Sequence, residues 1–167
     1  MNPVHEKSSE KKIQLLTRTI LSIFRLNSAL LNGGNQLLRE QEVDSTDWQV
    51  LGAIALTELP MTAPAIADEM GMTRQGAQKR LNKLKAGDYV FHVPNPRHDR
   101  SPIWRLTDKG KALFQRIMEL YEMWMKRLLD EFPIVLDDLN AISGLLDKME
   151  HTLANLDIKK DVLQLSE

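Results

Sequence analysis

A basic segment between Gly71 and Lys111 holds the side chains whose types and spacing best suggest chemistry. It carries ten Lys or Arg against three Asp, whereas the remainder of the 167-residue chain carries twelve against twenty, for a net charge of −1. Such asymmetry is typical of a nucleic-acid-binding module joined to a body that stays off DNA. We therefore expect contacts to phosphates and base edges, in preference to a chance clustering of charge on a solvated face.

The first group of candidate residues lies on a predicted helix over residues 74–86. At about 100° per residue, Ala77, Leu81 and Leu84 form one apolar stripe. Opposite and flanking this stripe are amide and basic groups without any acid, and we expect them to contact DNA: Thr73, Arg74, Gln75, Gly76, Gln78, Lys79, Asn82 and Lys83. Gln and Asn can pair with adenine, and Arg or Lys with guanine. A solvated helix face usually mixes both charge signs, and this one does not.

A second basic group lies in the turn-forming stretch 94–102, between β-rich runs at 89–93 and 103–106. This pattern predicts a β-hairpin whose tip carries Arg97, His98 and Arg100. An arginine on such a tip can enter a narrow, electronegative minor groove, so these three residues are also expected to contact DNA. Asp99 either orients a neighbouring arginine or is an ordinary turn aspartate.

No constellation in the sequence suggests catalysis. The chain has no Cys, which excludes disulfides, thiolate metal sites and thiol nucleophiles. Its four His are scattered, and no HExxH pair, glycine-rich phosphate loop or Ser nucleophile motif is present. We predict a protein that is not an enzyme and uses no cofactor or metal.

Long amphipathic helices are predicted at both ends of the chain. Apolar residues recur at helical intervals from Lys11, and the Gly33–Gly34 pair leaves open a kink or an early end, with a continuous, bent helix favoured. Thr107 is expected to cap a helix that continues through Leu129, and Pro133 to begin a last helix. These helices carry more apolar surface than one subunit could cover, which indicates a homodimer.

Shorter helices are predicted between them. Ser45 or Thr46 is expected to cap a helix that ends before Pro60. Thr62 and Thr73 are expected to cap helices 63–70 and 74–86, which meet across a turn containing Gly71. Two helices joined in this way, followed by a hairpin, form a winged helix-turn-helix pattern.

The sequence resembles the MarR family of bacterial regulators over roughly residues 11–156. The resemblance is carried by the segment GMTRQGAQKRLNKLKAGDYV, the wing NPRHDRSP, and Leu106-Thr107-Asp108-Lys109-Gly110, which is similar to the family's L-T-x-x-G. It implies that Arg100 is the residue that reaches the minor groove. The family usually has Asp two residues before this arginine, where this sequence has His98.

The expected fold is mainly α with a small β-hairpin wing: a winged helix-turn-helix with N- and C-terminal dimerisation helices. We assign residues 1–10 to a disordered N-terminus, 11–42 to the N-terminal dimerisation helix and 43–110 to the DNA-binding region. Residues 111–158 are assigned to the C-terminal dimerisation helices and 159–167 to a flexible tail.

The predicted function is sequence-specific binding of double-stranded DNA by a transcriptional regulator, on a pseudopalindromic operator. The resemblance implies a repressor that responds to a small aromatic effector, for which Phe24, Trp48, Met61 and Trp104 are candidate ligand-binding residues, although such positions are also typical of a core. No signal peptide or membrane-length apolar run is present, so a cytoplasmic protein without a membrane partner is expected. The alternatives are a metal-responsive regulator of the same fold and a winged-helix protein-interaction module.

Overall fold

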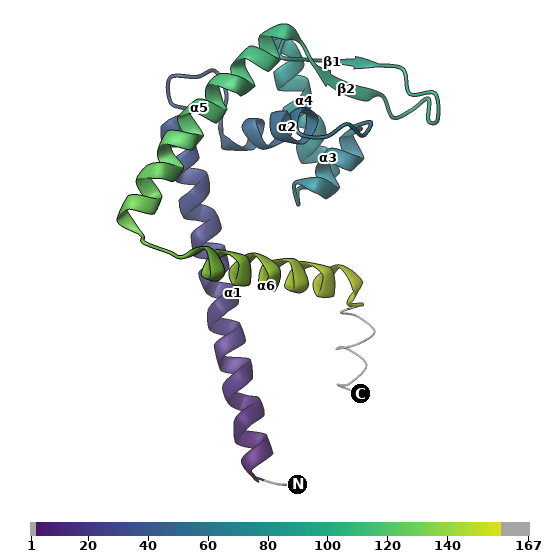
Figure 1. The fold of residues 1–167 in the computed structure, drawn as a ribbon. Coiled ribbons are helices and arrows are strands. Elements are labelled where there is room, and N and C mark those ends of the chain that lie inside the picture. Colours follow the sequence, from purple (N-terminus) through teal and green to yellow (C-terminus); the bar gives the residue numbers. More distant parts are fainter. Residues whose placement is uncertain (1–2, 158–167) are drawn as a thin grey trace. The chain divides into compact units, whose positions relative to one another are not determined.

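The computed structural model describes residues 3–157 of the chain, which are mainly helical with one β-hairpin, as predicted (Figure 1). The elements in order are α1 (Pro3–Leu37), α2 (Ser45–Ala55), α3 (Ala63–Glu69), α4 (Arg74–Ala86), β1 (Val90–Val93), β2 (Ile103–Leu106), α5 (Asp108–Glu131) and α6 (Leu136–Asn155). The chain divides into two compact units, residues 1–122 and 123–167. In the described part, no helix has the length and apolar character needed to span a membrane.

The core of the first unit lies where α2, α3, α4 and the hairpin meet. The predicted stripe of α4 is fully buried, since Ala77 and Leu81 are 0% exposed and Leu84 is 1% exposed. Ile66 and Ala67 of α3 are buried against it. The helix-turn-helix packing predicted from the sequence is therefore confirmed.

The turn between α3 and α4 also follows the prediction. Gly71 has a φ of +59°, a backbone conformation that favours glycine. The Thr62 hydroxyl accepts a hydrogen bond from the Ala65 N–H at 3.3 Å, and that of Thr73 accepts one from the Gly76 N–H at 3.0 Å. These two caps satisfy backbone donors at the starts of both helices.

The first helix passes through Gly33–Gly34 without interruption (Figure 1). Gly34 is buried against the start of α2, and a Cβ at this position would lie 2.4 Å from the Ser45 Oγ. In the observed arrangement the Ser45 hydroxyl donates to the Leu31 carbonyl at 2.9 Å, and the Ser45 N–H donates to Asn35 Oδ1, also at 2.9 Å. Gly34 therefore serves the close approach of α1 to α2.

The cap of α2 differs from the prediction. Asp44, and neither Ser45 nor Thr46, is the N-cap: its side chain accepts from the Thr46 and Asp47 N–H groups, and the Asp47 side chain accepts from the Asp44 N–H in return. The Ser45 hydroxyl is committed to α1, so it cannot cap α2. Asp44 and Asp47 form a reciprocal capping box.

Two helix starts also differ from the prediction. Helix α1 begins at Pro3, within the stretch 1–10 assigned to a disordered terminus; proline is favoured in a first turn, and an existing helix extends at little cost. Helix α6 begins at Leu136 instead of Pro133, because the β-branched Val135 is extended and Asp137 follows in the first turn, where a negative charge is favourable. The tail assigned to 159–167 lies outside the described residues.

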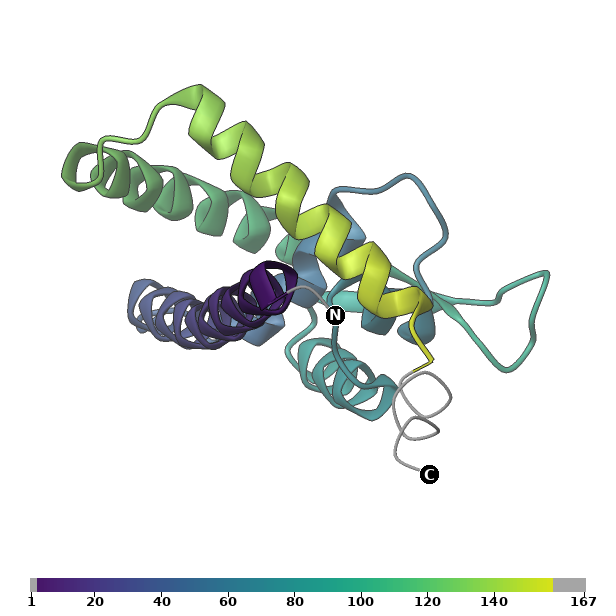
Figure 2. The ribbon, with the colours of Figure 1, turned by 90° about the horizontal axis from the view of Figure 1, so that it is seen from below.

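The hairpin is anchored on one side by the chain before α3. β1 and β2 are antiparallel, with Val90 opposite Leu106. The Trp104 N–H donates to the Met61 carbonyl at 2.8 Å. Beyond the paired strands, the loop between β1 and β2 projects away from the helices of the first unit (Figure 2).

The L-T-x-x-G motif joins the hairpin and α5 to the end of α4. The Thr107 hydroxyl donates to the Asp88 carbonyl at 2.7 Å and accepts from the Gly110 N–H at 2.9 Å. A Cβ on Gly110 would lie 1.9 Å from the Tyr89 carbonyl oxygen. The motif that carried the family resemblance is therefore a structural junction, in which the backbone of α5 at Gly110 packs directly against the backbone of Tyr89.

Large apolar side chains remain exposed on α1 and α6, and no described residue of α6 is buried within its own chain. On α1 they include Ile13, Leu15, Leu16, Leu21, Phe24, Leu26 and Leu30; on α6 they include Leu136, Leu139, Ile142, Leu145, Leu146 and Leu153. Surfaces of this kind usually cover another protein surface.

We expect Gly110→Ala to lower the free energy of unfolding by about 3 kcal/mol, because the new methyl group collides with rigid backbone. Gly52→Ala is the matched control: its Cβ would meet Phe114 at an ordinary 3.7 Å, so the change should stay within about 1 kcal/mol and tend to stabilise. Urea unfolding followed by circular dichroism measures both. Equal stabilities for the two variants would show that α5 can move away from Tyr89.

Candidate nucleic-acid interface

The polar face of α4 is open to solvent. Seven of the eight residues predicted on it are exposed, and Gly76 is half-buried: Thr73, Arg74, Gln75, Gln78, Lys79, Asn82 and Lys83 are the exposed ones. Because Ala77, Leu81 and Leu84 are buried, the rotation of α4 about its axis turns this set outward. The structure thus brings the predicted residues together on one surface.

Two amides on this surface are already ordered. Gln78 Nε2 donates to Asn82 Oδ1 at 2.9 Å, one helical turn away. This bond uses one donor and one acceptor, so the Gln78 carbonyl and the Asn82 amino group still offer an acceptor and a donor. A complementary pair of this kind matches the edge of an adenine in the major groove.

Four of the five cations of α4 fall into two classes, and the fifth, Lys85, lies with its Nζ 3.1 Å from His92 Nε2. None of the ion pairs found among residues 3–157 includes Arg74 or Lys79. Arg80 and Lys83, in contrast, both bind the carboxylates of α2 and its cap. The sequence predicted Lys83 as a DNA contact on a face without acids, and the structure gives its ammonium group an acidic partner from another helix.

Asp47 lies at the centre of these ion pairs, and its side chain is 0% exposed. Its Oδ1 accepts from Arg80 Nη1 at 3.1 Å, and its Oδ2 accepts from the Lys83 ammonium and from the Asp44 N–H at 3.0 Å. Asp44 also binds Arg80, and its Oδ2 lies 3.7 Å from Lys83 Nζ. We call these four side chains the α2–α4 charge cluster.

The pKa of Asp44 reflects its place in this cluster. Partial burial raises the pKa, but the hydrogen bond from the Asp47 N–H and the charges of Arg80 and Lys83 outweigh burial and hold the pKa below its usual value of 3.8. The carboxylate is therefore ionised at neutral pH and keeps both cations attached to α2.

The wing tip is organised by Asn95, a residue that the sequence reasoning did not single out. Asn95 is 8% exposed; its amide donates to the Ser101 carbonyl at 2.9 Å, and its Oδ1 accepts from the Arg97 N–H at 3.0 Å. The His98 N–H donates to the Asn95 carbonyl at 3.1 Å. An Asn two residues before an arginine in a turn-rich segment is the signal that could have identified this Asx turn.

The three wing residues predicted to contact DNA, Arg97, His98 and Arg100, are all exposed. No ion pair within residues 3–157 joins Asp99 to Arg97 or Arg100. The described contacts therefore give no support to the idea that Asp99 orients a neighbouring arginine. The backbone of the tip, held by Asn95, positions both arginines instead.

The C-terminal end of α4 is fixed separately. Asp88 takes a φ of +59°, and the Tyr89 N–H donates to the Leu84 carbonyl at 2.9 Å, which closes the helix. The Tyr89 hydroxyl donates to Glu42 Oε2 at 2.7 Å. This hydrogen bond to an anion, together with burial, raises the pKa of Tyr89 to about 12. Lys109 lies over the ring, with Nζ 4.4 Å from its centroid.

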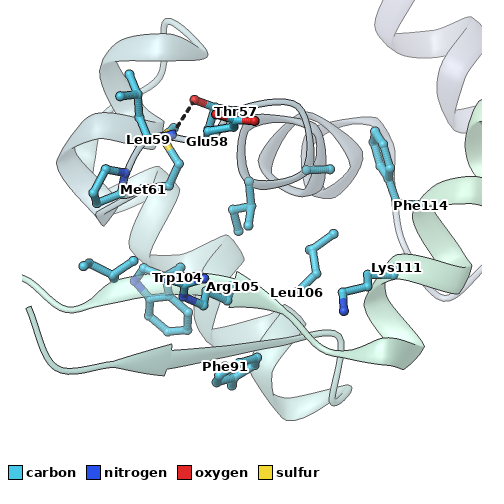
Figure 3. Close-up of a pocket in the computed structure, with 14 residues that line it drawn as sticks. Thr57, Glu58, Leu59, Met61, Phe91, Trp104, Arg105, Leu106, Lys111 and Phe114 are labelled. Carbon is cyan, nitrogen blue, oxygen red and sulfur yellow. Dashed lines mark hydrogen bonds between the residues drawn. The ribbon is translucent and has the colours of Figure 1, made fainter.

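The four candidate ligand-binding residues do not form one site. Met61 and Trp104 line a cleft of about 640 Å³ between the chain before α3, the hairpin and the start of α5, where Phe91 and Phe114 also lie (Figure 3). Trp48 lines a second cleft of about 400 Å³, and its ring centroid lies 4.9 Å from that of Tyr121. Phe24 is 66% exposed on α1 and lines neither cleft.

Metal binding has no visible site in the described part of the chain, where no three His, Asp or Glu side chains are grouped to hold an ion.

A sequence model of the MarR family matches residues 42–101, the segment from the α1–α2 loop into the loop between β1 and β2. An uncharacterised protein of Mycobacterium tuberculosis is 29% identical to this chain over 115 residues, which are 69% of this chain and 79% of that protein. The family model therefore covers the helix-turn-helix, α3 and α4, by sequence alone.

Solved structures extend the likeness to the fold. Staphylococcus aureus MarR, solved in complex with salicylate and kanamycin, superposes with a TM-score of 0.71 at 18% identity, covering 84% of this chain and 93% of that one. The M. tuberculosis transcriptional regulator MosR, solved in complex with DNA, gives 0.66 at 19% identity, covering 82% and 98%. The chain therefore has the winged-helix fold of MarR-family regulators.

We expect Asp44→Asn to be less stable than the wild type at neutral pH, with a difference that shrinks as the pH falls. The folded-state pKa of Asp44 is lowered, so its contribution is fully present above its usual pKa of 3.8 and is lost as the pH falls through the folded value. Urea unfolding across acidic and neutral pH measures the difference.

The control is Asp44→Ala. Asn still caps a helix and Ala does not, so the gap between these two variants should be about 1 kcal/mol and independent of pH. A difference between wild type and Asp44→Asn that stays constant with pH would mean that the charge of Asp44 contributes nothing.

Proposed function

We propose that this chain, which belongs to the MarR family of DNA-binding transcription regulators, is a sequence-specific repressor that binds a pseudopalindromic duplex operator as a homodimer. The observation that carries the proposal is the polar face of α4. Seven of its eight residues are exposed, and its acceptors, its donors and two cations without an ion pair among residues 3–157 face outward opposite a fully buried stripe. Such a face is suited to the major groove.

The proposed DNA contacts divide by chemistry. On α4, Gln75, Gln78, Lys79 and Asn82 are assigned to base edges, and Thr73, Arg74 and Gly76 to positions around them. On the wing, Arg100 is assigned to the minor groove and Arg97 and His98 to the flanking phosphates. The order provided by Asn95 supports this assignment, because a tip held in one conformation loses less entropy on binding.

Dimerisation is proposed to occur through α1, α5 and α6. The support is their exposed apolar side chains, which a single described chain leaves in contact with water. A symmetric pair would present two copies of α4 about one helical turn apart, or about 10 bp, and so match a pseudopalindrome.

An effector is proposed to act through the clefts beside Phe114, which lines both of them. Both clefts are rich in aromatic, Met and aliphatic side chains and lie next to the elements that support α4 and the wing. A small aromatic molecule fits this lining. Because Trp48 and Trp104 line different clefts, tryptophan fluorescence of single Trp→Phe variants can report which one is occupied.

The protein-interaction and metal-responsive alternatives lack comparable support. A module that binds only proteins would not need an acid-free basic face, and within residues 3–157 no three His, Asp or Glu side chains are grouped so that they could hold a metal ion.

We expect Arg100→Ala to weaken binding to a selected operator and to lower the slope of log K against log salt by about 0.9 for each subunit. Gln75→Ala should instead reduce the discrimination between operator and mixed-sequence DNA by about 1–3 kcal/mol with little change in slope. Fluorescence anisotropy of labelled duplexes at several salt concentrations measures both quantities.

Arg116→Ala is the matched control, since Arg116 is exposed on α5 and pairs with Glu119, and its slope should equal that of the wild type. If Arg100→Ala binds with the wild-type affinity and slope, the wing is not a DNA contact. If the wild type binds no duplex in a salt-dependent manner, the protein-interaction alternative gains over the proposed function.

Light scattering should give about twice the 19.1 kDa mass of one chain. Leu145→Glu on α6 should give the monomer mass, because it places a charge in the proposed interface although Leu145 is 63% exposed in one chain. Leu59→Glu, at a site 74% exposed before α3, should remain dimeric. A wild-type monomer at micromolar concentration would rule out this dimer.

A further inference from the structure

The α2–α4 charge cluster of Asp44, Asp47, Arg80 and Lys83 separates the basic residues of α4 that are paired with carboxylates from those that remain available to DNA. Lys83 belongs by its helical position to the outward face, and its side chain is 48% exposed. Its ammonium group nevertheless binds Asp47, whose carboxylate is wholly buried. Lys79, one turn earlier on the same helix, has no such partner among the described residues.

The burial of Asp47 decides which partner Lys83 keeps. If the ammonium turned outward to a phosphate, the buried carboxylate would lose one of its two cations, and a buried charge that loses a partner is far costlier than an exposed one. Asp44, with its Oδ2 3.7 Å from Lys83 Nζ, adds to the same attraction. Although the Lys83 side chain is half-exposed, its ammonium group therefore stays on Asp47 and is not free to bind a phosphate.

We propose that Asp47 is a specificity-determining residue that withholds Lys83 from the DNA backbone while it positions α4 through Arg80. This inference rests on the proposed DNA-binding function. Phosphate contacts attract every sequence equally, whereas base contacts discriminate. By neutralising Lys83, Asp47 lowers the affinity of α4 for DNA of any sequence and leaves discrimination to the base-reading amides and Lys79.

The test is the salt dependence of binding to a mixed-sequence duplex, measured by fluorescence anisotropy for the wild type and three variants. Lys83→Met should keep the wild-type slope, because its charge is already neutralised. Asp47→Asn should steepen the slope by about 0.9 for each copy of the freed lysine and bind the duplex several-fold more tightly at low salt. The double variant Asp47→Asn/Lys83→Met should return to the wild-type slope.

Arg97→Ala is the positive control, because Arg97 is assigned to a flanking phosphate, and it should lower the slope by about 0.9 for each subunit. If Lys83→Met lowers the slope as much as this control does, Lys83 is a phosphate contact and the inference is wrong, while the proposed function stands. An Asp47→Asn variant that is folded but keeps the wild-type slope also overturns the inference.

Thermal melts accompany each variant, because Asp47 also takes part in the capping box of α2. Should Asp47→Asn fail to fold, Lys83→Met still decides the outcome, since Lys83 is half-exposed and its loss leaves Arg80 on Asp47. A wild type that binds the duplex without salt dependence would overturn the proposed function itself, which is a different result from any of those above.

Discussion

A carboxylate without solvent contact determines how α4 sits on its neighbours. The Asp47 side chain is buried, and a buried carboxylate is stable only when cations pair with it. Arg80 and Lys83 must therefore lie where the two carboxylate oxygens of Asp47 point. The apolar stripe of α4 gives most of the burial, but apolar contacts are non-directional and tolerate small shifts along or about the helix axis. The charge cluster adds direction to that packing and so fixes the surface that α4 presents.

The C-terminal end of α4 is held by hydrogen bonds and close backbone packing, which connect it to the loop after α1 and to the start of α5. Tyr89 donates to Glu42 in the loop after α1, and Gly110 lets the start of α5 abut the Tyr89 backbone. Thr107 completes this junction by bonding both Asp88 and Gly110. Because α4, the wing and α5 meet at this one junction, a displacement of the start of α5 would be transmitted to the proposed DNA-contacting surface.

Where the sequence reasoning was wrong, a residue had two possible partners and tertiary structure chose between them. Ser45 is as good a cap for α2 as Asp44 by local rules, but its hydroxyl bonds the Leu31 carbonyl of α1. At Gly33–Gly34, in contrast, the favoured continuous helix is confirmed, and the close approach of Gly34 to Ser45 explains why a glycine stands there. Asn95 is not predicted as the organiser of the wing tip, because Asn is common in turns and only the folded loop brings its side chain to Ser101 and Arg97.

The sequence by itself determined which side chains of α4 face outward, where the turn at Gly71 falls and where the hairpin begins, because helical period, glycine conformation and β propensity are local properties. Only the tertiary structure decided which outward cations remain available and where the clefts lie. Lys83 and Asp47 are 36 positions apart, and no periodicity relates them. Their pairing follows from the packing of α2 on α4, which brings a buried carboxylate within reach of a lysine that the helical period alone assigns to DNA.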